Sequence, residues 1–187
     1  DEQVRTFLAI LVSAQARQAL ENCMQKLSGL APAGVRWVDP QGIHLTLRFL
    51  GNIPAAAVDE VLAAQAAAAE ACPPFSVQLS RLCMFPNRRR PRALWAGVAG
   101  DIEALERLQQ AVETQLERIG FPREKRPFVP HLTLGRVRDR VSDASRTRIA
   151  GCVSSAILDD TGPWLVEESH LIRSTLTPQG AIYTSIG

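Results

Sequence analysis

The chain has 187 residues, of which 46% are hydrophobic and 21% charged, as is ordinary for a globular protein. This composition excludes a disordered chain and a fibrous repeat, and no apolar run is long enough to cross a bilayer. With 21 Lys and Arg against 19 Asp and Glu, the net charge of +2 is too small to indicate a nucleic-acid partner by itself.

The first half of the chain predicts strands separated by two helices. Short apolar or alternating runs bounded by Pro and Gly predict strands at residues 5–12, 35–38, 43–50 and 75–79. Apolar residues at helical spacing predict a helix from about Ala14 to Leu27, with Ser13 as its N-cap and Gly29 as its stop. A second, alanine-rich helix must end at the proline pair 73–74.

The second half repeats this order. A strand is predicted at residues 93–99, and Asp101 is a plausible N-cap for a helix that ends at Gly120. A second histidine strand and a weaker helical stretch at 142–152 follow. The C-terminal segment predicts two strands joined by a turn at residues 178–180. We therefore expect an α+β fold in one domain, residues 1–187, whose two similar lobes are mostly antiparallel sheets facing a central cleft, with helices outside.

The tetrapeptide His-Leu-Thr-Leu occurs twice, at His44 and at His131, in a chain that has only three histidines. Residues two apart on a strand share a face, so each histidine lies beside a threonine, Thr46 or Thr133, while the leucines point into the core. If the lobes face each other, two imidazoles and two hydroxyls converge on one cleft.

Such a set suits displacement at phosphorus. Histidine alone supplies both an acid and a base near neutral pH, so one ring can accept a proton from an attacking oxygen while the other protonates a leaving oxygen. Threonines and arginines can hold the remaining phosphate oxygens. The pattern predicts cleavage of a phosphodiester without a metal.

The paired motifs resemble the signature of the two-histidine phosphoesterase superfamily. The segments "RTFLAI", "HLTLRFLG", "RALWAGV", "RPFVPHLTLGR" and "LIRSTLTPQGAIYT" are similar in order and spacing to the RNA 2',3'-cyclic phosphodiesterase family, once named as 2'-5' RNA ligases. The resemblance covers nearly the whole chain. One departure is Leu-Val-Ser-Ala after "FLAI", where that family usually has a proline, which affects entry into the helix and not the chemistry.

The resemblance implies hydrolysis of a terminal 2',3'-cyclic phosphate to a 2'-phosphate, without cofactor or metal. It makes His44 the proton donor to the leaving oxygen and His131 the proton acceptor from water. The partners of the protein would be RNA ends or nucleotides that carry a cyclic phosphate. The sequence does not distinguish among tRNA fragments, oligonucleotides, cyclic mononucleotides and ADP-ribose cyclic phosphate as substrates. Reversible 2'-5' ligation is left open too.

Thr46, Thr133 and Arg136 are the candidate phosphate-binding residues. Arg136 corresponds to a phosphate-contacting arginine that the family often places beyond the second motif. Strict alternation would turn it toward the core with the leucines, so the strand must twist, bulge or end near Gly135 for Arg136 to reach the cleft.

Three aromatic residues, Phe7, Trp95 and Phe128, are candidates for stacking on a base, although core packing is the better interpretation of Phe7 and Trp95. Tyr183 and Trp164 are interpreted as packing residues with polar edges. His170, with no threonine two residues on, is interpreted as structural. The arginine-rich segment 88–92 fits a solvated turn and a grip on RNA phosphates equally well.

Two other functions compete with the enzyme. An RNA-end-binding module without turnover is disfavoured, because permanently charged arginines would serve binding better than histidines. A metal hydrolase is disfavoured because no carboxylate lies at ligand spacing from either histidine.

The remaining expectations concern the cysteines, the cellular location and the oligomeric state. Cys23, Cys72, Cys83 and Cys152 show no metal or redox spacing and are interpreted as small buried residues in a reducing compartment. With no secretory pattern, we expect a cytoplasmic monomer that binds no membrane.

Overall fold

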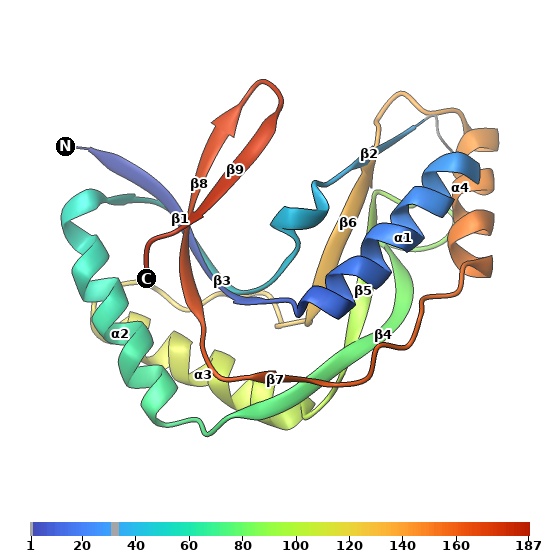
Figure 1. Ribbon diagram of the computed structural model, residues 1–187. Coiled ribbons are helices and arrows are strands. Elements are labelled where there is room, and N and C mark those ends of the chain that lie inside the picture. The colour runs from blue at the N-terminus through green and yellow to red at the C-terminus, as the bar shows by residue number, and fades with distance from the viewer. Residues whose placement is uncertain (1, 31–33) are drawn as a thin grey trace.

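The computed structural model describes residues 2–30 and 34–187, which form two antiparallel sheets with helices on their outer sides (Figure 1). The first sheet has the strand order β3-β1-β8-β9. Its strands are β1 (Gln3–Leu11), β3 (His44–Pro54), β8 (His170–Thr177) and β9 (Gly180–Ser185). The second sheet has the order β2-β6-β5-β4-β7. Its strands are β2 (Val35–Trp37), β4 (Phe75–Phe85), β5 (Ala93–Gly100), β6 (His131–Val137) and β7 (Trp164–Val166).

Each sheet has its own pair of helices. The helices are α1 (Ala14–Leu30), α2 (Val58–Glu70), α3 (Ile102–Arg118) and α4 (Asp143–Ser155), with short 3-10 turns η1 (Pro40–Gly42) and η2 (Ala55–Ala57). In Figure 1, α2 and α3 lie together beside the first sheet, and α1 and α4 lie beside the second. The expected fold class, two mostly antiparallel sheets with outer helices, is confirmed.

The lobes do not coincide with the halves of the sequence. Helix α1 follows β1 of the first sheet, but its Cys23 and Leu27 pack with Val35 and Leu94 of the second sheet. Helix α3 follows β5 of the second sheet and packs on β3 of the first. Because each helix crosses to the other sheet, one continuous core joins the lobes.

Most predicted elements are present, and the differences concern their ends. Ser13 caps α1, with its Oγ accepting from the Ala16 amide at 3.2 Å, but the helix runs past Gly29 to Leu30. Asp101 stands at the N-cap position of α3 without capping it. Its carboxylate accepts instead from the Ser76 amide of β4 at 3.0 Å and so joins helix start to sheet. The C-terminal segment, predicted as two strands, forms β8 and β9 and contributes most of a third strand, β7, ahead of them.

Two further expectations concern the burial of the cysteines and the presence of membrane-spanning segments. Cys23 is buried as expected, but Cys72, Cys83 and Cys152 are only half-buried, and all four are free thiols. Across residues 2–30 and 34–187, none of the helices is both long enough and apolar enough to span a membrane.

Candidate active site

Both motif histidines are oriented by the same local bond. The Nδ1 of His44 lies 2.7 Å from the Gly42 carbonyl oxygen, and the Nδ1 of His131 lies 2.7 Å from the Val129 carbonyl oxygen. A carbonyl only accepts, so each Nδ1 carries the proton and donates it. This fixes the tautomer and leaves Nε2 as the basic nitrogen of each neutral ring.

The short turn before β3 holds the carbonyl that orients His44. Asp39 caps η1 by accepting from the Gln41 amide at 2.9 Å, and the Gly42 amide donates to the Asp39 carbonyl. Arg17 of α1 reaches this turn, donating to the Gln41 side chain at 3.4 Å and to the Val12 carbonyl at 3.3 Å. The turn is therefore fixed to helix α1.

The reverse side of each motif is fully buried. Leu45 and Leu132 are 1% and 0% exposed, and the second leucine of each motif is equally covered. Thr46 and Thr133 are half-buried and lie on the opposite side, with the histidines. We call this side of each sheet the motif face. The predicted pairing of each imidazole with a hydroxyl on one face is thus present.

The two rings are close enough to interact electrostatically. Strands β3 and β6 belong to different sheets but lie against each other. Positive charge on His131 contributes to lowering the pKa of His44. The fold therefore brings the two motifs together from opposite sheets.

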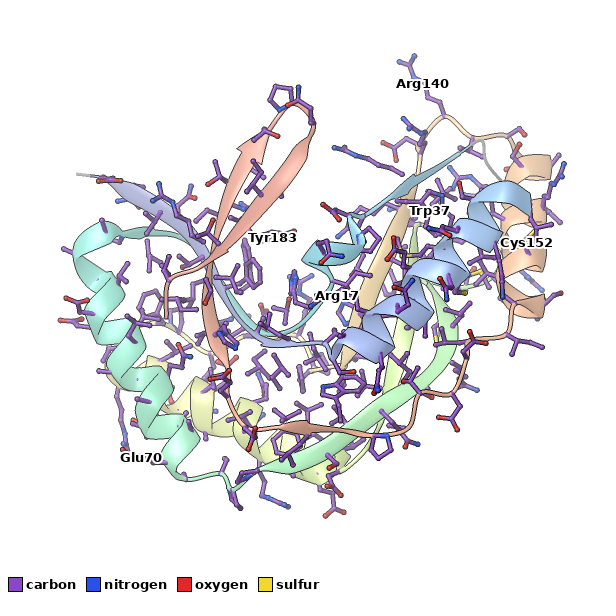
Figure 2. The ribbon with its side chains drawn as sticks, viewed as in Figure 1. Arg17, Trp37, Glu70, Arg140, Cys152 and Tyr183 are labelled. Carbon is purple, nitrogen blue, oxygen red and sulfur yellow. The ribbon has the colours of Figure 1, made fainter. Side chains whose placement is uncertain are left out.

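His44 is enclosed by aromatic rings. Phe7 stacks on it with ring centroids 4.4 Å apart and planes 27° apart, and Tyr183 meets it edge-on at 5.1 Å. Figure 2 shows Tyr183 pointing from the β8–β9 hairpin toward the middle of the molecule. Burial is the largest cause that lowers the pKa of His44, while the bond to the Gly42 carbonyl acts in the opposite direction.

His131 has a more open setting. Its side chain is exposed, and its one ring contact in the described chain is Trp95 of β5, which meets it edge-on at 5.6 Å. Trp95 is half-buried and keeps part of its surface in solvent. Trp95 is thus adjacent to a motif histidine and open to contact.

The structure corrects one of the stacking candidates. Phe7 is 3% exposed and its ring is covered by His44 and Tyr183, so it supports the imidazole and presents no open face to a base. Phe128 is partly buried and packs against the main core.

Arg136 lies on the motif face because β6 contains a β-bulge. Trp95 pairs with Thr133 and Leu94 with Gly135, so Leu134 has no partner on β5. The extra residue shifts the alternation: Gly135 and Val137 are buried, and Arg136 between them is exposed. A side chain at Gly135 would meet the Val35 methyl at 2.8 Å, so β2 packs closely against this bulge. Of the three alternatives that the sequence left open near Gly135, a twist, a bulge or a strand end, the structure shows the bulge.

Strand β3 has the same bulge after its own motif. Ala9 pairs with Thr46 and Leu8 with Arg48, so Leu47 has no partner on β1. Arg48 therefore takes the place of Gly135 and points to the core side, where its Nε lies 3.5 Å from the Glu113 carboxylate. Phe49 takes the place of Arg136 on the motif face, with the Arg5 guanidinium 4.7 Å from its ring centroid.

Sequence reasoning missed two residues of this region, Tyr183 and Arg36. Tyr183 was interpreted as a packing residue, and its contact with His44 depends on the strand order β1-β8-β9, which nothing in the segment "GAIYTS" indicates. Arg36 pairs directly with Arg136 across β2 and β6, a register that local patterns do not reveal. His170, in contrast, fits its structural interpretation, with its Nε2 3.4 Å from Glu168.

Side chains that could ligate a metal are scattered over the molecule. Within the described ranges, no three His, Cys, Asp or Glu side chains gather closely enough to hold a metal ion.

Comparisons with known proteins agree with the paired motifs. The chain matches the family model described as LigT like Phosphoesterase over residues 10–95 and 97–183. It is 31% identical over 184 residues to the RNA 2',3'-cyclic phosphodiesterase of Methanothermobacter thermautotrophicus, covering 98% of this chain and 97% of that protein. The protein of the same name from Archaeoglobus fulgidus is 32% identical over 186 residues, with 98% of each covered.

Solved structures show the same architecture. TT0787 of Thermus thermophilus superposes with a TM-score of 0.78 at 28% identity, covering 98% of this chain and 95% of that one. E. coli LigT complexed with 3'-AMP superposes with a TM-score of 0.73 at 26% identity, covering 100% and 97%.

Proposed function

The chain belongs to the LigT-like phosphoesterase family, and from this we propose that it hydrolyses RNA terminal 2',3'-cyclic phosphates to 2'-phosphates. The observation that carries the proposal is the matched pair of imidazoles. Each donates from Nδ1 to a backbone carbonyl at 2.7 Å, so both rings offer Nε2 to a substrate. Relatives covered over nearly their whole length bear the name RNA 2',3'-cyclic phosphodiesterase, which supports this substrate class.

The proposed reaction is an in-line displacement at phosphorus. The Nε2 of His131 takes a proton from water as its oxygen bonds to phosphorus. The bond from phosphorus to the 3'-oxygen breaks, and the Nε2 of His44 gives its proton to that oxygen. A 2'-phosphate and a free 3'-hydroxyl result, with the two rings exchanged in protonation. The order of the two roles rests on the family resemblance.

The other motif residues would hold the phosphate. Thr46 and Thr133 lie on the same face as their histidines, and the β6 bulge turns Arg136 to that face. Hydroxyl and guanidinium donors around the equator of the phosphorus stabilise the charge that builds on its oxygens. Trp95, beside His131, and the partly buried Phe128 are the remaining candidates for contact with a base.

The lowered pKa of His44 fits a proton donor that acts on a bound anion. Burial under Phe7 and Tyr183 disfavours the charged ring in the free protein. A phosphate anion beside Nε2 favours the protonated ring again. Once protonated, a ring with a lowered pKa is the stronger acid and gives its proton to the leaving oxygen more readily.

We propose that no metal takes part and that residues 1–187 work as one two-lobed, monomeric domain. An acid, a base and cationic donors already cover each need of the displacement. The reverse reaction, 2'-5' ligation, would use the same two histidines with their roles exchanged. Substrates would be RNA ends and nucleotides that carry the cyclic phosphate.

The competing function is an RNA-end-binding module without turnover. It is tested by incubating the protein with cytidine 2',3'-cyclic phosphate in excess EDTA and identifying products by phosphorus NMR. We expect 2'-CMP to accumulate at the same rate with and without EDTA. Binding without product would favour the RNA-end-binding module. Formation of 3'-CMP would show that the 3'-oxygen is not the leaving group. Loss of activity in EDTA would show that the reaction needs a metal.

A further inference from the structure

The second sheet ends in a group of arginines, of which the proposed reaction uses only Arg136. Arg36 of β2 lies directly opposite Arg136 of β6, and both side chains are exposed. Val35 and Trp37 contact the core side of Gly135, so Arg36 projects to the motif face beside Arg136. Like charges directly opposite each other in a sheet destabilise it unless an anion lies between them.

The loop between β4 and β5 adds further arginines at the same end. Residues 88–90 are all arginine and all exposed, in a turn closed by the Asn87 side chain, which accepts from the amides of Arg89 and Arg90 at 3.0 and 3.1 Å. The loop leads directly into Ala93, which pairs with Arg136. The loop arginines therefore lie at the same end of the second sheet as the Arg36–Arg136 pair.

Arg146 of α4 ties this loop to the segment after β6. Its guanidinium donates to the Pro91 carbonyl at 3.1 Å and to the carbonyls of Arg138 and Asp139 at 3.3 and 3.1 Å. The backbones of these two segments, each of which carries exposed arginines, are thus held close together. Figure 2 shows Arg140, farther along the second segment, projecting into solvent at this end of the molecule.

The arginines at this end form no ion pair in the part of the chain that the structure describes. Elsewhere, Arg48, Arg123 and Arg173 each form an ion pair with a glutamate. Among the described residues, no ion pair includes Arg36, Arg136, Arg138 or the loop arginines 88–90. We call five of these residues, all except Arg136, the arginine rim. Uncompensated arginines that border a phosphate site are the electrostatic pattern of a nucleic-acid backbone contact.

We propose that the arginine rim binds the phosphodiester backbone of an RNA strand upstream of its terminal cyclic phosphate, with Arg36 on the first upstream phosphate. This inference rests on the proposed function and narrows its substrate class to oligonucleotide ends rather than cyclic mononucleotides. Arg136 lies on the same strand as His131 and Thr133. Arg36 lies one strand farther out, about 4.8 Å to the side, where the chain would leave the catalytic pair.

The test compares one variant on two substrates. Arg36→Gln removes the charge at an exposed strand position, and Arg118→Gln, exposed on α3 behind the other sheet, is the matched control. Cytidine 2',3'-cyclic phosphate has no upstream phosphate, and a pentanucleotide ending in the same cyclic phosphate has several. We expect Arg36→Gln to lower kcat/KM for the pentanucleotide about tenfold, through KM, and to change it less than twofold for the mononucleotide.

Salt dependence gives a second readout. Each lost contact to a single strand should reduce the slope of log kcat/KM against log salt by about 0.7 for the pentanucleotide only. An equal loss on both substrates would instead assign Arg36 to the terminal phosphate, and no loss on either would make it a solvated arginine. Both results overturn the proposal.

A binding measurement separates this inference from the proposed function. Fluorescence anisotropy with a labelled pentanucleotide ending in a 2'-phosphate needs no turnover. Tighter binding than for labelled 2'-CMP, reduced about tenfold by Arg36→Gln, supports the arginine rim even if the cyclic phosphate is not hydrolysed. Equal affinity for the two ligands would overturn it even in an active enzyme.

Discussion

Strands β3 and β6 carry the same tetrapeptide and the same bulge, yet they differ at the two positions that follow. After the first motif, Arg48 is turned inward to Glu113 and Phe49 occupies the motif face. After the second, Gly135 is turned inward against β2 and Arg136 occupies that face. The same kind of β-bulge therefore places an aromatic side chain on the motif face of the first sheet and a cationic side chain on that of the second. The chemistry of each motif face depends on the residue that the bulge turns outward.

The histidines differ in the same sense. His44 lies half-buried between Phe7 and Tyr183 with its pKa lowered, whereas His131 is exposed beside Trp95. Two rings with identical Nδ1 bonds thus meet opposite surroundings. Unequal surroundings are what an acid and a base with different tasks require.

Removing either ring should have the largest effect. We expect His44→Ala and His131→Ala each to lower kcat by roughly 10³- to 10⁴-fold on a cyclic phosphate substrate, because each removes one proton transfer. Turnover is followed by product chromatography, and the fold is checked by circular dichroism. His170→Ala, the third histidine, is the control and should retain nearly full activity. A folded motif variant with wild-type turnover would remove that ring from the mechanism.

Changing the residue that each bulge turns outward should affect catalysis differently in the two sheets. Arg136→Gln should lower kcat/KM by about 10- to 100-fold, since a hydrogen bond to a charged group contributes about 1.5–3 kcal/mol. Phe49→Leu, the matched change on β3, should lower it less than threefold. Steady-state kinetics on one cyclic mononucleotide measures both. Equal losses of kcat/KM would show that Arg136 is no more important to the reaction than Phe49.

Filling the inward position of the second bulge should weaken the fold. In Gly135→Ala the new methyl group would lie 2.8 Å from Val35, and we expect about 1–3 kcal/mol of lost unfolding free energy. Gly29→Ala, in helix α1 with open space around it, should stabilise by about 0.5–1 kcal/mol. Urea denaturation measures both. A neutral Gly135→Ala would mean that β2 does not pack closely on the bulge.

The smallest expected effect is a shift in pH dependence. Burial lowers the pKa of His44, so Tyr183→Ala, which admits water to the ring, should raise that pKa. The limb of the bell-shaped kcat/KM profile that follows the titration of His44 should then move to higher pH, while Tyr183→Phe, which keeps the ring, should leave it in place. Identical movement in both variants would assign the effect to the hydroxyl group rather than to burial.

The same shift affects stability in acid. The folded protein binds the His44 proton more weakly than the unfolded chain does. The neutral ring therefore contributes stability that is fully present above the pKa of the unfolded chain and is lost as pH falls through the pKa of the folded protein. Urea denaturation of the wild type and His44→Gln as a function of pH should show a smaller acid loss in the variant.

Local patterns in the sequence predicted much of this molecule. Alternation in "HLTL" assigned the faces of His44 and His131, and it required a twist, a bulge or a strand end near Gly135 if Arg136 was to leave the core side. What local patterns could not supply depends on long-range pairing. The crossing of α1 and α3 to opposite sheets, the contact of Tyr183 with His44 and the opposition of Arg36 and Arg136 arise from strand order and register, which join residues far apart in the chain.

The central claim is that His44 and His131 flank one phosphorus atom from opposite sides. A crystal structure with uridine vanadate, which copies the five-coordinate transition state, tests it most directly. We expect the Nε2 of His131 within hydrogen-bonding distance of one apical oxygen and the Nε2 of His44 within the same distance of the other. Vanadate in contact with only one of the two rings, or with neither, would contradict it.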